Sequence, residues 1–159
     1  MALPTATTKI IAGGAWCQVR IREASGGTLK VIGLATEASY SEDFQLQPAA
    51  VIGYLGPASI DSQGYTCSIT IGTFVPENKA STGYPGAGDT TLTDLLSTRS
   101  EVQEAGKGKT FDYLDFYNTA TGEVINAFSQ AIISSDGSRI APNSYVSQNI
   151  TLLSIERTV

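Results

Sequence analysis

Residues 65–74 read YTCSITIGTF, and this stretch decides the fold class. Larger and mostly apolar side chains alternate in it with small polar ones: Tyr65, Cys67, Ile69 and Ile71 on one side, and Thr66, Ser68 and Thr70 on the other. A period of two residues is typical of a β-strand with one buried face. We therefore expect a strand here that pairs with strands close to it.

The segment toward the amino terminus repeats this pattern. Residues 15–22 alternate strictly, with Cys17, Val19 and Ile21 opposite Gln18, Arg20 and Arg22. A turn at residues 25–27 leads into residues 28–34, which are rich in apolar and β-branched side chains. The two segments are predicted to form a β-hairpin.

The segment toward the carboxyl terminus begins with a loop, residues 76–88, that is rich in Gly and Pro. Residues 90–100 are predicted to form a short helix. Thr90 or Thr91 would cap it, and its apolar stripe would be Leu92, Leu95 and Leu96. Gly106 would end any continuation.

The last third of the chain is predicted to be a β-meander. Its strands would be residues 110–118, 123–133 and 145–157, joined by turns at 119–122 and 134–138. The predicted fold class is mainly β: a small antiparallel β-barrel or sandwich with one short flanking α-helix and a long protruding hairpin. Residues 1–159 fit a single domain.

Residues 35–64 form an excursion that runs from acidic to apolar. It is too long for a passive connection, so it is either functional or carries strands of its own. Its apolar run, VIGYL at residues 51–55, lies between Pro48 and Pro57. An apolar run of this kind predicts an interaction surface.

Charge is scarce in this chain: 16% of residues are charged, against about 25% in a typical soluble domain. Burial of the outer surface against other subunits would explain the deficit, and so would a Ser/Thr-rich antiparallel sheet. The net charge of −5 and the scattered cations exclude a basic patch that grips phosphates. The chain contains neither a secretory signal nor an apolar run of about 20 residues, which predicts synthesis in the cytoplasm and no membrane span.

Catalytic chemistry has little support. The absence of His excludes the usual triads and the commonest general base. Asp112 and Asp115 would leave opposite faces of a strand, whereas Glu101 and Glu104 fit a solvated helix end. Cys17 and Cys67 are interpreted as reduced core residues, with a disulfide between neighbouring strands as the alternative. We expect no enzyme activity, no metal and no cofactor.

The order of these elements resembles the tail tube proteins of contractile-tailed bacteriophages and the tubes of related injection machines. The resemblance is carried by Ile32-Gly33-Leu34 through Ala38-Ser39-Tyr40-Ser41, by Gly53-Tyr54-Leu55-Gly56-Pro57, and by the Thr- and Ser-rich strand within residues 64–73. It implies a β-barrel subunit with one flanking helix that stacks in six-fold rings. The inner strands of a ring join around a lumen, and a long hairpin reaches the neighbouring ring.

The resemblance also implies roles for particular residues. Inter-ring contacts are expected at Val51, Ile52, Tyr54, Leu55 and Pro57. Residues expected to line or rim the lumen are Glu37, Glu42, Asp43 and Asp61. A neutral or negative wall would let DNA pass during ejection without binding it.

Edge strands are expected to pair with those of neighbouring subunits. The implied partners are further copies of the chain, the tail sheath and the baseplate, in a virion tail assembled in the host bacterial cytoplasm.

Alternative functions remain open from sequence. The first is another virion structural protein, such as a head decoration or tail terminator protein. The second is a carbohydrate-binding β-sandwich that uses exposed Trp16, Tyr40, Tyr54 and Tyr84. The third is a hydrolase that depends on a pair of carboxylates.

Overall fold

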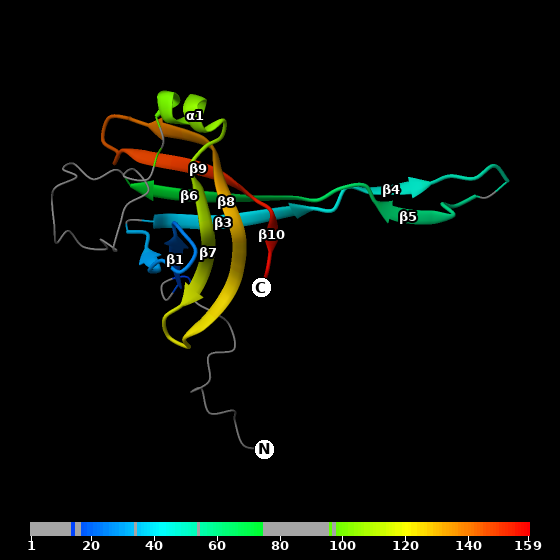
Figure 1. Ribbon diagram of the computed structural model, residues 1–159, viewed down its shortest axis with the longest axis horizontal. Coiled ribbons are helices and arrows are strands. Elements are labelled where there is room, and N and C mark those ends of the chain that lie inside the picture. Colours follow the sequence, from blue (N-terminus) through cyan, green and yellow to red (C-terminus); the bar gives the residue numbers. More distant parts are fainter. Residues whose placement is uncertain (1–13, 15–16, 34, 54, 75–95, 97) are drawn as a thin grey trace, which may run out of the picture.

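The computed structural model describes residues 14, 17–33, 35–53, 55–74, 96 and 98–159. Eight strands form one antiparallel sheet, and two more form a separate hairpin (Figure 1). From edge to edge the sheet runs β2 (Lys30–Val31), β1 (Cys17–Arg22), β7 (Thr110–Asn118), β8 (Glu123–Arg139), β9 (Ser147–Ser154), β6 (Thr66–Phe74) and β3 (Ala35–Asp43), and β10 (Glu156–Arg157) pairs with β8. The predicted mainly β, antiparallel fold is confirmed.

The sheet is open and folds over itself. No ladder within the described ranges joins its two edges, so the architecture is the sandwich rather than the closed barrel. Tyr40 of β3 shows the folding: its ring centroid lies 6.4 Å from that of Phe116 on β7 and 5.4 Å from that of Phe128 on β8. The space between the two halves is filled by the core, which includes Val19, Ile21, Ile69, Ile71, Leu114, Phe128, Ile150 and Leu152.

The predicted alternation of β6 and β1 is confirmed. Cys67, Ile69 and Ile71 of β6 are fully buried, whereas the intervening side chains are not. On β1 the polar side carries Arg20, whose Nε donates to Asp115 Oδ1 at 2.9 Å. Arg22 makes a separate pair with Asp112, so the two aspartates do not share a partner. The buried Asp115 carboxylate is thus compensated by a guanidinium.

The predicted turn at residues 134–138 is wrong. Strand β8 continues to Arg139, and the connection to β9 falls at residues 140–146. Ser, Asp and Gly in this segment are typical of turns, but their backbones pair with β9, with Gly137 opposite Asn149. A register shift between Ile133 and Ser135 keeps the ladder intact.

The helix prediction is also wrong in its bounds. Helix α1 spans Arg99–Ala105, and its N-cap is Thr98, which forms a capping box with Glu101. Leu96 lies before this helix and packs against the core, while residues 90–95 lie outside the described ranges. Gly106 ends the helix with φ 72°, as predicted. Among the described helical residues, none form a segment long and apolar enough to cross a membrane.

The two cysteines lie on strands that are not adjacent. Cys67 is buried on β6, Cys17 is half-buried on β1, and the two form no disulfide with each other. The structure therefore agrees with reduced cysteines and not with a disulfide between neighbouring strands.

Gly108 allows the connection after α1 to lie against β8. A Cβ atom at this position would clash with the carbonyl oxygen of Ile133. The Ile133 amide donates to the carbonyl of Lys109 at 3.0 Å, so this close approach anchors the helix connection to the sheet.

Gly108→Ala is therefore expected to destabilise the protein by about 1–3 kcal/mol, because the two backbones must move apart. Gly137→Ala is the matched control, since an added Cβ meets nothing within 4 Å there. Urea unfolding measures both variants at an unchanged m-value. Equal midpoints for the two variants would contradict the close approach.

Candidate functional site

A long hairpin projects from one end of the sheet. Its strands are β4 (Leu46–Ala49) and β5 (Ser59–Ser62), which pair with each other and with no other described strand. Because β3 leads into β4 and β5 leads back to β6, the hairpin prolongs the β3–β6 ladder away from the body (Figure 1). Every described residue from 43 to 63 is exposed. A two-stranded hairpin of this kind is marginally stable alone, so a contact elsewhere would stabilise it.

The residues predicted to make inter-ring contacts lie at the far end of this hairpin. Ile52 and Leu55 are fully exposed, at 103% and 110%, and Val51 is 48% exposed. Pro57 is also exposed, and Tyr54 lies outside the described ranges. The hairpin therefore presents large apolar side chains to solvent, and their contact with a neighbouring ring stays a prediction.

A polar cluster ties the carboxyl-terminal strand to the root of the hairpin. The Tyr65 hydroxyl donates to Glu42 Oε1 at 2.7 Å, and Arg157 Nε lies 2.9 Å from Glu42 Oε2. The Arg157 amide donates to the Tyr65 oxygen at 3.2 Å, and its guanidinium lies 5.4 Å from the centroid of the Tyr40 ring. We call Glu42, Tyr65 and Arg157 the root cluster. It joins β3, β10 and the residue before β6.

The root cluster shifts the pKa values of its members. The hydrogen bond from Tyr65 and the ion pair with Arg157 lower the pKa of Glu42. Burial, together with the hydrogen bond to Glu42, raises the pKa of Tyr65 to about 12. At neutral pH the cluster therefore holds an ionised carboxylate and a neutral phenol.

The sheet face opposite the core is lined by short polar side chains. One row of directly paired residues crosses four strands: Ser39 on β3, Thr70 on β6, Thr151 on β9 and Ser135 on β8. We call this the polar face, which also includes Ser41, Ser68 and Asn149. All of these residues are exposed or half-buried, and Leu153 is an apolar exception beside them. The polar face offers hydroxyl and amide groups but no charge in its centre.

The structure separates the four residues predicted for the lumen. Glu37 and Asp43 lie at the two ends of β3 on the polar face, because each is an even number of residues from Ser39. Glu42 lies on the opposite side, in register with the buried Cys67. Asp61 lies on β5, where it accepts a hydrogen bond from Ser59.

The aromatic residues considered for carbohydrate binding do not form a described platform. Trp16, Tyr54 and Tyr84 lie outside the described ranges. Tyr40 packs against Phe116 and Phe128 instead of standing free. The observed surfaces are thus a hairpin, a polar face and the outer edge of β3, which no strand in the described ranges covers.

Sequence reasoning missed two features. The root cluster joins residues far apart in the chain, and no local pattern pointed to it. The polar face was partly visible, since Thr66, Ser68 and Thr70 alternate with buried residues. Its width, however, depends on the register of four strands.

Comparison with known proteins supports the fold. No family model matches the sequence, and no curated protein matches it. A chain from the tail of an empty GTA particle, solved with C6 symmetry, has a TM-score of 0.60 and 11% identity, covering 92% of this chain and 96% of that chain. The SPP1 tail tube has a TM-score of 0.63 and 11% identity, covering 92% and 77%. A chain of the PVC sheath–tube complex, from an extracellular contractile injection system, has a TM-score of 0.58 and 16% identity, covering 96% of both. The chain has the fold of these tail and tube proteins, as the resemblance implies.

The root cluster predicts a pH-dependent contribution to stability. Because the pKa of Glu42 is lowered by folding, its stabilisation is present at neutral pH and is lost as the pH falls through the folded value, below 4.5. Glu42→Gln should therefore be less stable than the natural chain at neutral pH, and this difference in stability should be smaller at about pH 3. Urea unfolding at both pH values measures the difference.

Glu104→Gln, at an exposed position on α1, is the matched control and should show no such difference. If Glu42→Gln is less stable than the natural chain by the same amount at both pH values, an ionic role for the cluster is contradicted.

Proposed function

We propose that this chain is a structural subunit that stacks in rings to build the inner tube of a phage-type tail or a related injection machine. The observation that carries this proposal is the outer edge of β3, which pairs with no described strand, is nine residues long and continues into a fully exposed hairpin. An edge of this length is a template for another strand. A lone soluble subunit would need to protect it.

Lateral pairing through this edge would close a ring. Strand β3 (ATEASYSED) contains neither Lys nor Pro, the residues that commonly block edge pairing. The opposite end of the sheet is the short β2, beside β1, and would receive the β3 edge of the next subunit. The C6 symmetry of the GTA tail favours six subunits in such a ring.

The polar face would then form the wall of the lumen. Short hydroxyl side chains bind phosphates weakly. Tight binding of DNA is driven by Lys and Arg side chains that displace the counterions of the phosphates, and the centre of this face has neither residue. Glu37 and Asp43 would rim the wall and repel a duplex over about 8–10 Å. The wall would thus let DNA pass during ejection without specific binding.

The hairpin would reach the next ring. Its apolar tip has no partner among the described residues, and burial between rings would give it one. In this role the chain is a virion tail component without catalytic activity, and its partners are further copies, a tail sheath and a baseplate. The assembly would form in the cytoplasm of the bacterial host.

Negative-stain micrographs of the purified protein at rising concentration test the proposal, and hollow rods or stacked rings are expected. Isolated monomers or closed trimers at high concentration would contradict it and favour a decoration protein.

Proline variants test the role of the β3 edge. Amide directions alternate along a strand, so one of Ala38→Pro and Ser39→Pro removes a donor that points away from β6. The variant that keeps the native unfolding midpoint should stay monomeric. If both variants keep that midpoint and still form rings, lateral pairing through β3 is wrong.

A reconstruction of the assembled tube tests the lumen assignment. The side chains of Ser39, Thr70 and Thr151 should face the pore, and the pore-lining residues should sum to a neutral or negative charge. A pore lined by the Arg20 and Arg22 side of β1 would contradict the assignment while leaving the tube intact.

A further inference from the structure

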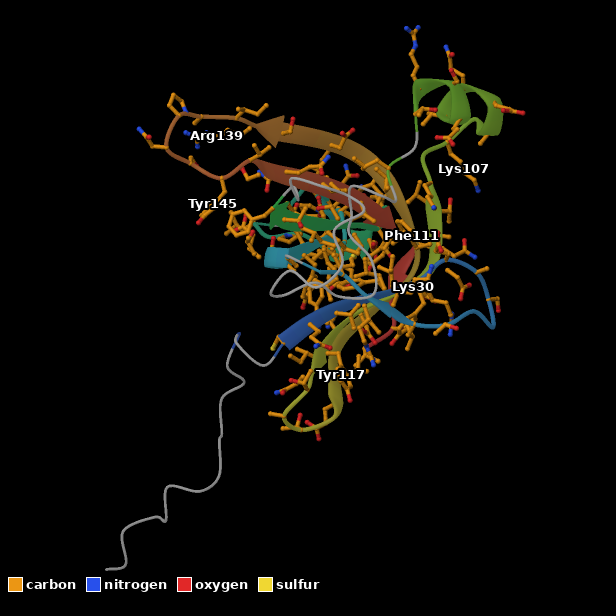
Figure 2. All side chains as sticks on the ribbon, turned by 90° about the vertical axis from the view of Figure 1, so that its left-hand side faces the viewer. Lys30, Lys107, Phe111, Tyr117, Arg139 and Tyr145 are labelled. Atoms are coloured by element: carbon orange, nitrogen blue, oxygen red, sulfur yellow. The ribbon has the colours of Figure 1, made fainter. Side chains whose placement is uncertain are left out.

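The end of the molecule opposite the hairpin carries an exposed apolar patch. It consists of Phe74 at the end of β6 with Ile140 and Tyr145 in the β8–β9 connection, and we call it the end patch. Ile140 and Tyr145 are each 80% exposed, and Phe74 is 40% exposed. The rings of Phe74 and Tyr145 contact each other with centroids 5.5 Å apart. Figure 2 looks onto this end and shows Arg139, the last residue of β8, and Tyr145 in the connection that follows it.

The end patch is fixed to the main sheet. Phe74 pairs with Ser147 of β9, and Ser147 pairs in turn with Arg139 of β8, so three strands end in one row. The connection between Arg139 and Ser147 turns at Asn143, which adopts φ 59°. An apolar patch on a rigid sheet end is suited to docking, because binding a partner there costs little conformational entropy.

The hairpin tip has the complementary composition. Residues 44–60 contain no charge, and Ile52 and Leu55 stand fully exposed among them. Asp61, on β5, directly follows this uncharged stretch and is negative. Arg139, at the end of β8, directly precedes Ile140 of the end patch and is positive. Within the described part of the chain Arg139 has no ion-pair partner, so opposite charges remain for a contact between the two surfaces.

We propose that the end patch receives the hairpin tip of a second copy of this chain. The hairpin points away from the end patch of its own subunit, so only another copy can bring the two together (Figure 1). Each copy carries one hairpin at one end and one end patch at the other. Such a contact is heterologous and leaves a free surface at both ends of every pair, so it repeats along one direction. This inference rests on the proposed stacking function and names the receiving surface for it.

Two double variants test the contact. The hairpin variant, Ile52→Ser with Leu55→Ser, keeps the end patch, and the end variant, Ile140→Ser with Tyr145→Ser, keeps the hairpin. Each alone should raise the protein concentration needed for stacking by about tenfold or more. Ile125→Ser with Ile155→Ser removes two exposed apolar side chains elsewhere and is the control, which should stack like the natural chain. Unfolding midpoints check that all variants stay folded.

Mixing the two variants after ring formation gives the sharper result. The intact hairpins of the end variant should dock on the intact end patches of the hairpin variant, and micrographs should show pairs of rings that grow no further. If the mixture shows only single rings, the two surfaces do not meet and the inference is overturned. An end variant that stacks like the natural chain also overturns it, while leaving the stacking function in place. If the natural chain forms no stacks, the proposed function fails, and this inference fails with it.

Discussion

The alternation of side chains along β6 and β9 is the constraint on which the rest of the structure depends. Strands β6 and β9 pair so that the apolar residues of both point to the same side. The side chains that this register directs into the core are Ile69, Ile71, Ile150 and Leu152. Ser68, Thr70 and Thr151 are left on the opposite side. A slip of one residue would bury hydroxyls and expose the apolar set, so the register is strongly specified. The same constraint gives the sheet one apolar face and one polar face. Its polar face and its open edge at β3 therefore lie outside the core of the subunit.

Local patterns predicted those elements whose cause is local. The strand predicted at residues 110–118 has the bounds of β7, because this segment is rich in aromatic residues and is bounded by a Gly/Lys loop before it and the turn at residues 119–122 after it. The turn predicted at 134–138 failed because hydrogen bonds to β9, which are not local, hold these small polar residues in a strand. For the helix, the sequence contains the Thr98 and Glu101 capping box, but the stripe of leucines predicts a start several residues too early. Leu96 serves the core instead.

The candidate site was predictable to a similar degree. The exposure of Ile52 and Leu55 follows from an apolar run between two prolines that has no alternation to bury it. The separation of Glu42 from Glu37 and Asp43 also follows from counting along one strand. What Glu42 contacts did not follow, because Tyr65 and Arg157 reach it from distant segments.

These features together are consistent with the low charge of the chain. The polar face carries hydroxyl and amide groups in place of ions, and the hairpin carries exposed apolar side chains. The central claim is that β3 pairs with a neighbouring subunit. Hydrogen–deuterium exchange of β3 amides, compared between dilute and concentrated protein, tests it most directly. Outward-facing amides of β3 should become protected on assembly, while those of β6, which already has β3 and β9 on its two sides, should change little. Assembly without any gain of protection in β3 would contradict the claim.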